Sequence, residues 1–274
     1  MTENMSVSAD SRAHCAQPEM AALFISDLHL QAEMPRTTQA FLTFLTQQAR
    51  HSRQLYLLGD IFEAWAGDDD ITDEYHQQIV SALRQLADQG VQLFWMAGNR
   101  DFLVGPAFAA ASGMTLLNDP YVVTIAGLKI VLTHGDAQCT DDDAYMRFRA
   151  QVRKPDWQRH FLALPLAERK IIIASMRAGS RAAQREKPYQ IMDVNQDEIK
   201  NLFDRTGTNI MIHGHTHRPA CHDETIDGIT RRRYVLSDWD LDGGANDYAT
   251  RGDWLAIDCD GNIMRMNAST LGKI

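Results

Sequence analysis

Short apolar runs alternate with amphipathic stretches along the first half of the chain. Residues 21–25, 55–58 and 91–97 are apolar and of strand length. Between them, residues 37–50 and 70–89 place apolar side chains at helical spacing. This alternation predicts a parallel or mixed sheet with helices packed outside it.

Paired strands are predicted in the middle and at the end of the chain. Residues 121–132 read as a hairpin that turns at Ala126-Gly127, and residues 254–266 as one that turns at Asp260-Gly261. A further strand is expected at 233–236. These strands indicate a second sheet. We therefore expect an α/β fold in which a two-sheet β-sandwich lies between helical layers (α/β/β/α).

The chain between the two hairpins is mostly helical in pattern. From Asp141 to Lys187 the apolar positions are Tyr145, Phe148, Val152, Phe161, Leu162, Ile172 and Met176. Asn195 and Glu198 then form a capping box that starts a helix, with Val194 as a hydrophobic staple and Gly207 as the end. We expect a single domain over residues 20–274, preceded by a disordered extension at 1–19.

Charge is unevenly distributed along this acidic chain. The net charge of −9 argues against a general nucleic-acid-binding protein. Residues 145–187 nevertheless carry eleven Lys/Arg against three Asp/Glu. This basic segment suggests an anionic substrate or an anionic membrane surface, although a solvated helix face is an equal alternative. No apolar run approaches the ~18 residues that cross a bilayer, so any membrane contact is expected to be peripheral.

Cysteine usage and the N-terminal residues indicate the compartment. Cys15, Cys139, Cys221 and Cys259 are scattered and contain no Cys-x-x-Cys pair, which is typical of reduced thiols in the cytoplasm. Residues 1–19 carry acidic residues and no apolar core, so they are not read as a signal peptide.

Five apolar strands end in residues that can bind a metal ion. These residues are Asp27, His29, Asp60, Asn99, His134, His215 and His217. In open α/β sheets, sites form where the strands end, so all five ends can line one crevice. The alternatives are ordinary turn dipeptides and surface histidines on a loop. Five such endings in one chain favour a site.

The donor set favours two metal ions over one. Seven ligands exceed the four or fewer that one tetrahedral zinc takes from a protein. Carboxylate, amide and imidazole ligands without thiolate favour Mn, Fe, Co or Zn. Two such ions activate water and clamp a phosphoryl group during in-line displacement. The expected chemistry is hydrolysis of a phosphate ester or anhydride.

The same residues resemble a known family. Asp27-x-His29, Gly59-Asp60, Gly98-Asn99-x-Asp101, His134-Gly135 and Gly214-His215-x-His217 are similar, in order, to the five motifs of calcineurin-like metallophosphoesterases. The resemblance implies one metal on Asp27, His29, Asp60 and His217. It implies a second on Asp60, Asn99, His134 and His215, with Asp60 shared and Mn²⁺ as the expected ion. His213 lies outside the pattern, and we expect a structural role for it.

Arg100 departs from the family pattern, which usually has histidine there. A guanidinium stays protonated and grips phosphate oxygens, but it cannot act as a general acid. Arginine therefore favours a pyrophosphate substrate, whose phosphate leaving group needs no proton. The alternative is an arginine that merely pairs with Asp101. We expect Asp60, Asn99 and Arg100 to be catalytic.

Further stretches resemble one subfamily, which cleaves a UDP-linked, twice-acylated glucosamine in lipid A biosynthesis. They include residues 59–65, 98–103, 139–142 and 191–195. The resemblance implies water attack at the α-phosphorus, release of UMP and the acylated sugar 1-phosphate, and a helical cap at about 141–187. It implies a cytoplasmic protein that binds peripherally to the anionic inner leaflet of the inner membrane. No obligate protein partner is expected. The implied substrate contacts are Asn99, Arg100, Asp142, Ser180, Gln184, Lys187 and His215.

Two positions depart from the subfamily. Gln184 stands where a shorter Asn is usual, and Ser237-Asp238-Trp239 where Gly-Asp-Trp is usual. The first puts one substrate contact in doubt. Glu63 and Trp65 are expected to support the fold and the surroundings of the metals. Two other functions remain open: a soluble phosphodiesterase or nucleotide pyrophosphatase, and a binding scaffold without catalysis.

Overall fold

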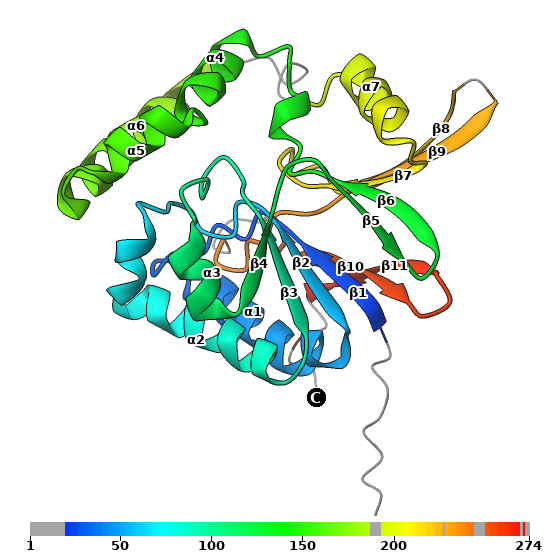
Figure 1. The fold of residues 1–274 in the computed structure, drawn as a ribbon, viewed down its shortest axis with the longest axis horizontal. Helices are drawn as coiled ribbons and strands as arrows, with labels where there is room; N and C mark the ends of the chain where they lie inside the picture. Colours follow the sequence, from blue (N-terminus) through cyan, green and yellow to red (C-terminus); the bar gives the residue numbers. More distant parts are fainter. Residues whose placement is uncertain (1–19, 187–192, 227, 244–249, 269–270, 272–274) are drawn as a thin grey trace, which may run out of the picture.

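A computed structural model describes residues 20–186, 193–226, 228–243, 250–268 and 271. Two β-sheets pack face to face, with helices on both sides (Figure 1). The predicted α/β/β/α sandwich is confirmed. The predicted extension at 1–19 lies outside the described residues.

The first sheet has six strands in the order β11-β10-β1-β2-β3-β4. Its strands β1 to β4 run parallel, while β10 and β11 are antiparallel additions at one edge. The strands are β1 Met20–Ile25, β2 Gln54–Leu58, β3 Gln92–Met96, β4 Met114–Leu117, β10 Asp253–Asp258 and β11 Ile263–Asn267.

The second sheet has five strands in the order β5-β6-β7-β9-β8. The predicted hairpin at 121–132 is present as β5 and β6, and β6, β7 and β9 run parallel. The strands are β5 Tyr121–Ile125, β6 Leu128–Leu132, β7 Ile210–His213, β8 Ala220–Ile226 and β9 Ile229–Val235.

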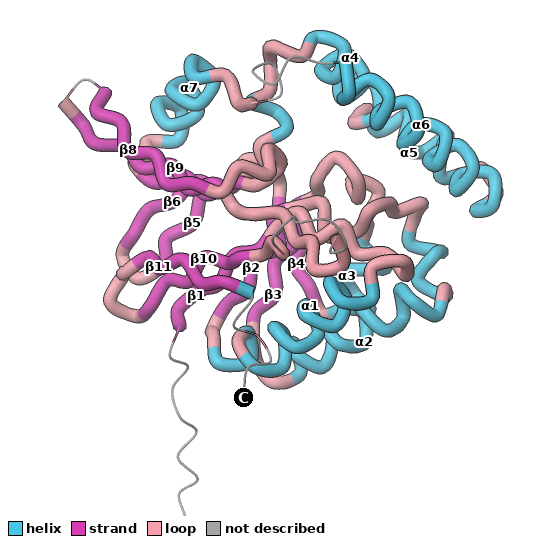
Figure 2. The backbone as a smooth tube through the Cα atoms, turned by 180° about the vertical axis from the view of Figure 1, so that it is seen from behind, coloured by secondary structure: helices cyan, strands magenta, loops and turns pink. Residues whose placement is uncertain are grey.

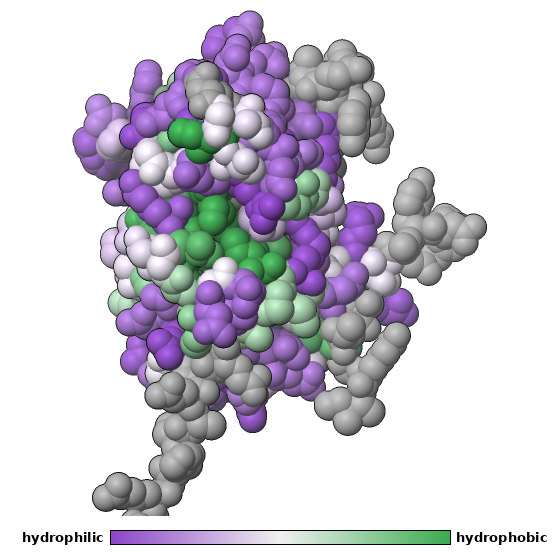
Figure 3. All heavy atoms as spheres, turned by 90° about the vertical axis from the view of Figure 1, so that its right-hand side faces the viewer, coloured by the Kyte–Doolittle hydropathy of each residue, from purple (hydrophilic) through white to green (hydrophobic). Residues whose placement is uncertain are grey.

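Three apolar clusters fill the three interfaces between layers. Phe41, Phe44 and Leu83 belong to the cluster between the first sheet and helices α1 (Pro35–Gln47), α2 (Glu74–Asp88) and α3 (Pro106–Ser112). Phe24 and Ile212 belong to the cluster between the sheets. The third cluster packs helix α7 (Gln196–Thr206) on the second sheet. Figure 3 shows the side of the molecule on which the β5–β6, β8–β9 and β10–β11 turns lie. Apolar residues gather at the centre of this face and are ringed by hydrophilic ones.

Helix α2 begins later than the pattern predicts. Residues Asp68–Thr72 form a short 3-10 turn, and α2 starts at Glu74. The reason is Asp73, whose side chain accepts a hydrogen bond from the backbone N–H of Tyr75 and so caps the helix. Further short 3-10 turns lie at Ala49–His51 and Asp136–Gln138.

The basic segment forms three helices that stand over one end of the sandwich (Figures 1 and 2). They are α4 Asp143–Val152, α5 Pro155–Leu162 and α6 Leu166–Glu186. Proline at the first position of α5 sets its start, since proline lacks the N–H that a helix interior needs. We call α4, α5 and α6 the cap. None of the described helices has the length and apolar character of a bilayer-spanning helix.

Candidate metal centre

The seven candidate ligands follow strands that end at one edge of the sandwich. Strands β1, β2 and β3 are parallel neighbours, and Asp27, Asp60 and Asn99 come just after them. Strands β6 and β7 are parallel neighbours in the other sheet, and they lead to His134 and His215. Two sheets therefore contribute to the same place because their parallel strands end there together.

The backbone is strained at most of these positions. Left-handed φ angles between 49° and 68° occur at Asp27, His29, Asp60, His215 and His217. Such angles cost about 1–3 kcal/mol each for residues other than glycine, and they cluster at functional sites. Among the described residues, Ala126 is the one other non-glycine residue with positive φ. The strain is thus concentrated where the sequence predicts the metal ligands.

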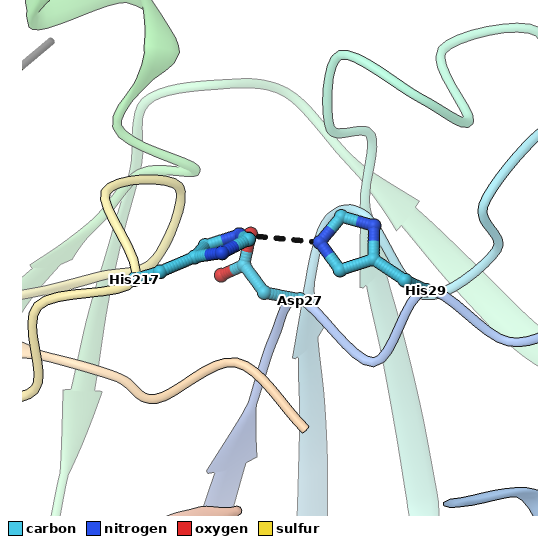
Figure 4. A group of neighbouring side chains, drawn as sticks. All are labelled: Asp27, His29 and His217. Carbon is cyan, nitrogen blue, oxygen red and sulfur yellow. Dashed lines mark hydrogen bonds and ion pairs between the residues drawn. The ribbon is translucent and has the colours of Figure 1, made fainter. Parts of the chain in front are cut away.

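Asp27, His29 and His217 form the first cluster, with one potential ligand atom from each lying within 4.8 Å of the others. The Nε2 atoms of His29 and His217 lie 3.2 Å apart (Figure 4). His217 Nε2 is 3.3 Å from Asp27 Oδ1, an oxygen that is buried without a hydrogen-bond partner. Three ligand atoms facing one point, one of them a buried oxygen without a hydrogen bond, fit a divalent cation.

Asp60, His134 and His215 form the second cluster, again within 4.8 Å. His134 Nε2 lies 3.7 Å from Asp60 Oδ1. Asn99 joins them, since its Oδ1 lies 3.1 Å from His134 Nε2 and 2.9 Å from His215 Nδ1. These contacts group the residues as the sequence suggests, and two adjacent clusters support a dimetal centre. The sharing of Asp60 between the two metals stays a prediction.

Charges in the site favour bound cations. Burial would raise the pKa of Asp27, but His217, His134 and His29 hold it well below its usual range. Burial and the charge of His134 lower the pKa of His215 to about 4, which leaves a neutral imidazole able to bind metal. Burial would also lower the pKa of His134, but Asp60, Asp27 and Asp136 raise it to about 9. The surrounding carboxylates therefore attract positive charge to this point.

Asp101 holds the two loops of the second cluster together, a role that the sequence did not reveal. Its carboxylate accepts hydrogen bonds from the backbone N–H groups of Gly98 and Ile61, both at 2.8 Å, and of Asp60 at 3.3 Å. Burial and the charge of Asp60 raise the pKa of Asp101 to about 6. The alternative that Arg100 pairs with Asp101 is wrong, because these backbone groups occupy the carboxylate.

Arg100 faces Asp60 and a cavity instead. Its backbone N–H donates to Asp60 Oδ1 at 2.8 Å, and its Nε lies 3.6 Å from Asp60 Oδ2. The buried Nε has no hydrogen-bond partner. A guanidinium that lies beside the second cluster and lines the cavity is suited to binding an anionic substrate group.

A cavity of about 820 Å³ lies between the clusters and the cap. Asp60, Asn99, His215 and His217 line its polar part. The cap contributes most of the apolar lining, including Tyr145, Phe148, Trp157, Phe161, Ile173 and Met176. The space suits a molecule with an anionic part near the clusters and an apolar part under the cap.

The predicted substrate contacts fall into two groups. Asp142 and Ser180 line the cavity, as do Asn99, Arg100 and His215. Asp142 also caps α4 by accepting from the backbone N–H of Tyr145 at 3.0 Å. Gln184 lies on α6, but its side chain is outside the described part of the structure, as is all of Lys187.

His213 is a member of neither cluster found among the described residues. It is buried, its Nδ1 lies 2.9 Å from the carbonyl oxygen of Gly214, and its Nε2 lies 3.1 Å from Arg233. Burial and the charge of Arg233 lower its pKa to about 3, so the ring is neutral. These contacts are those of a structural histidine.

Replacing Gly214 with alanine is expected to weaken metal binding at the first cluster. A Cβ at this position would collide with the carboxylate of Asp27 and the hydroxyl of Ser26. We expect metal affinity there to fall by about tenfold or more, since disturbing the groups that hold a metal ligand in place costs about 10- to 100-fold in affinity. Metal analysis after dialysis measures this. Gly179→Ala is the matched control, because a Cβ on Gly179 meets nothing within 4 Å. Equal metal content in both variants would contradict the prediction.

This chain is similar in sequence to proteins of known family. The calcineurin-like phosphoesterase profile matches residues 20–219. A UDP-2,3-diacylglucosamine hydrolase of Chromohalobacter salexigens is 50% identical over 220 residues, which cover 80% of this chain and 89% of the relative.

Two further hydrolases of this name show the same similarity. The one from Pseudomonas aeruginosa strain UCBPP-PA14 is 49% identical over 82% of this chain and 94% of its own length. The one from Escherichia coli O81 is 48% identical over 82% and 93% respectively. The chain therefore belongs to the calcineurin-like phosphoesterase family and, within it, to the UDP-2,3-diacylglucosamine hydrolases.

Proposed function

We propose that this protein hydrolyses the pyrophosphate bond of UDP-2,3-diacylglucosamine. The names of its relatives support this substrate. The structural observation that carries the proposal is the pair of ligand clusters beneath a cavity whose far wall is apolar. A nucleotide-linked lipid has the matching chemistry, with a charged diphosphate at one end and acyl chains at the other.

We assign one metal to Asp27, His29, Asp60 and His217, and the other to Asp60, Asn99, His134 and His215. Mn²⁺ is the ion we expect. Bound divalent cations supply an activated water and neutralise phosphoryl oxygens. The chain's part is to hold these ions on rigid strand ends, with Asp101 fixing the loop of Asp60 and Asn99. The strained backbone of the ligands supports such preorganisation.

Arg100 binds the diphosphate and stabilises the negative charge on the departing sugar phosphate. Water attacks the α-phosphorus, and the bond from that phosphorus to the bridging oxygen breaks. The products are UMP and 2,3-diacylglucosamine 1-phosphate. The leaving sugar phosphate needs no proton, so a permanently charged guanidinium is more useful than an acid. Asn99 and His215 line the same wall of the cavity and contact the phosphates.

The cap binds the lipid and faces the membrane. Acyl chains occupy the apolar wall of the cavity, while Asp142, Ser180, Gln184 and Lys187 contact the polar part of the substrate. Leu162 and Ile171 are exposed apolar side chains of the basic cap that do not line the cavity. Together with the lysines and arginines they suit the anionic cytoplasmic face of the inner membrane, to which the protein binds peripherally.

Release of UMP from the diacylated substrate tests this function. Purified protein is titrated with Mn²⁺, Mg²⁺, Co²⁺ and Zn²⁺, and turnover in ¹⁸O-labelled water is followed by mass spectrometry. We expect turnover to be greatest with Mn²⁺ and the label to appear in UMP, because water attacks the α-phosphorus. UDP-N-acetylglucosamine, which lacks the acyl chains, is the control. Equal cleavage of both substrates would overturn the lipid assignment and favour a general nucleotide pyrophosphatase.

A further inference from the structure

We propose that Glu63 is a positioning residue that orients the metal ligand His29 and couples it, through Arg177, to cap helix α6. The inference rests on the dimetal part of the proposed function and not on its substrate. It concerns three residues from three separate segments: the loop after β1, the loop after β2, and α6.

The ring of His29 has a different partner on each nitrogen. Its Nε2 faces His217 Nε2 within the first cluster at 3.2 Å. Its Nδ1 points out of the cluster (Figure 4) and lies 3.2 Å from Glu63 Oε2. His29 Nδ1 is buried and makes no hydrogen bond, so the Glu63 carboxylate is a close neighbour of the ring rather than a hydrogen-bonded partner. A carboxylate behind a ligating histidine fixes its tautomer and orientation and makes it a stronger ligand.

The other oxygen of Glu63 pairs with the cap. Arg177 NH2 of α6 donates to Glu63 Oε1, across 114 positions of sequence. The side chains of Arg177 and Glu63 are only 14% and 22% exposed, so solvent screens this pair less than a surface ion pair. Arg177 also lines the cavity beneath the cap. A continuous chain of contacts therefore runs from the cavity wall through Glu63 to a ligand of the first cluster.

The second histidine of this cluster provides an internal comparison. His217 Nδ1 lies 3.6 Å from Asp238 Oδ2, and Arg251 donates to that carboxylate from Nε and NH2 at 3.1 and 2.8 Å. The same order of histidine, carboxylate and arginine thus occurs twice around one cluster. Arg251 is not a cap residue, so of these two arms it is the Glu63 arm that links the first cluster to the cap.

Other ion pairs also anchor α6 to the core but contact no candidate ligand. Arg169 pairs with Asp69, and Lys170 Nζ lies 2.6 Å from Asp70 Oδ1. These pairs separate two effects. Breaking one of them loosens the cap and leaves metal binding unchanged. If the coupling exists, changing Glu63 or Arg177 loosens the cap and also weakens metal binding.

The test measures metal binding by the full-length protein. Glu63→Gln, Arg177→Met, the double variant and the control Asp69→Asn are titrated with Mn²⁺ by calorimetry, and the coupling between two bound Mn²⁺ ions is followed by electron paramagnetic resonance. We expect Glu63→Gln to weaken one of two sites by roughly 10- to 100-fold. Arg177→Met should weaken the same site by roughly 2- to 30-fold. The double variant should equal Glu63→Gln, and Asp69→Asn should equal the wild type.

Several outcomes overturn the proposal. Wild-type affinity in Glu63→Gln removes the positioning role. Equal weakening of both metal sites, together with a lower Tm of the metal-free protein, makes Glu63 a general structural residue. Wild-type affinity in Arg177→Met, or additive losses in the double variant, removes the coupling to the cap. Because the readout is metal affinity, none of these results depends on whether the substrate is the diacylated lipid.

Discussion

Replacing Asp60 with alanine is expected to lower kcat by on the order of 10³-fold or more, with metal content falling at the same time. Asp60 lies in the second cluster, and we assign it to both metals. Its loss therefore removes a ligand from each ion and leaves less negative charge to hold either. Measuring turnover of the diacylated substrate together with bound metal per chain tests this result.

The stability of this variant distinguishes a metal ligand from a structural residue. Burial and the charge of Asp60 raise the pKa of Asp101 to about 6, so the two carboxylates repel each other in the metal-free protein. Removing Asp60 relieves that repulsion but also removes its contacts with Arg100 and His134, so the Tm of the metal-free variant measures how far the lost turnover reflects a weakened fold. Asp70→Asn is the control for metal content, because Asp70 is also a buried aspartate but belongs to neither cluster. Turnover near the wild-type rate in Asp60→Ala would contradict the shared carboxylate.

The position of the site could be predicted because it depends on strand ends. A buried strand is visible in sequence as an apolar run, and polar residues after Ile25, Leu58 and Met96 mark its end. Parallel strands end at the same edge of a sheet, so local patterns were sufficient to bring Asp27, Asp60 and Asn99 together. The candidate ligands needed no knowledge of distant contacts.

Helix boundaries and short elements were harder to predict. The pattern at 70–89 does not distinguish the 3-10 turn at Asp68–Thr72 from the helix after it, because the two share one apolar stripe. Helix α3 and strand β4 have seven and four residues and were not predicted at all. Elements this short repeat their apolar pattern too few times to be recognised.

A supporting place for Glu63 near the metals was expected from sequence, but the contacts of the supporting carboxylates could not be predicted. Glu63 and Asp238 each lie between a candidate histidine ligand and an arginine, and they form ion pairs with Arg177 and Arg251 respectively. The Glu63–Arg177 contact joins residues 114 positions apart, and the cap brings them together only in the folded chain. No local pattern indicates such a contact, so its discovery required coordinates.

Replacing Arg100 with alanine is expected to lower kcat by about 10²- to 10³-fold while metal content stays unchanged. The side chain lies beside Asp60 with its Nε unused, and it lines the cavity. It is thus placed to bind the phosphate rather than to hold a metal. Arg100→Lys should retain part of the activity, because lysine keeps the charge but loses the planar pair of donors. Steady-state kinetics and metal analysis on the same samples measure both effects.

The choice of arginine is tested by changing the leaving group. A guanidinium stabilises a departing phosphate, whereas a histidine can protonate a departing alkoxide. Arg100→His should therefore slow pyrophosphate cleavage and raise the relative rate on a uridine 5′-alkyl phosphodiester, whose leaving group needs a proton. Arg84→Ala, which removes an exposed arginine on α2, controls for the loss of charge alone. If Arg100→His slows both substrates equally, Arg100 does not select the leaving group, and its contribution is confined to binding the phosphate.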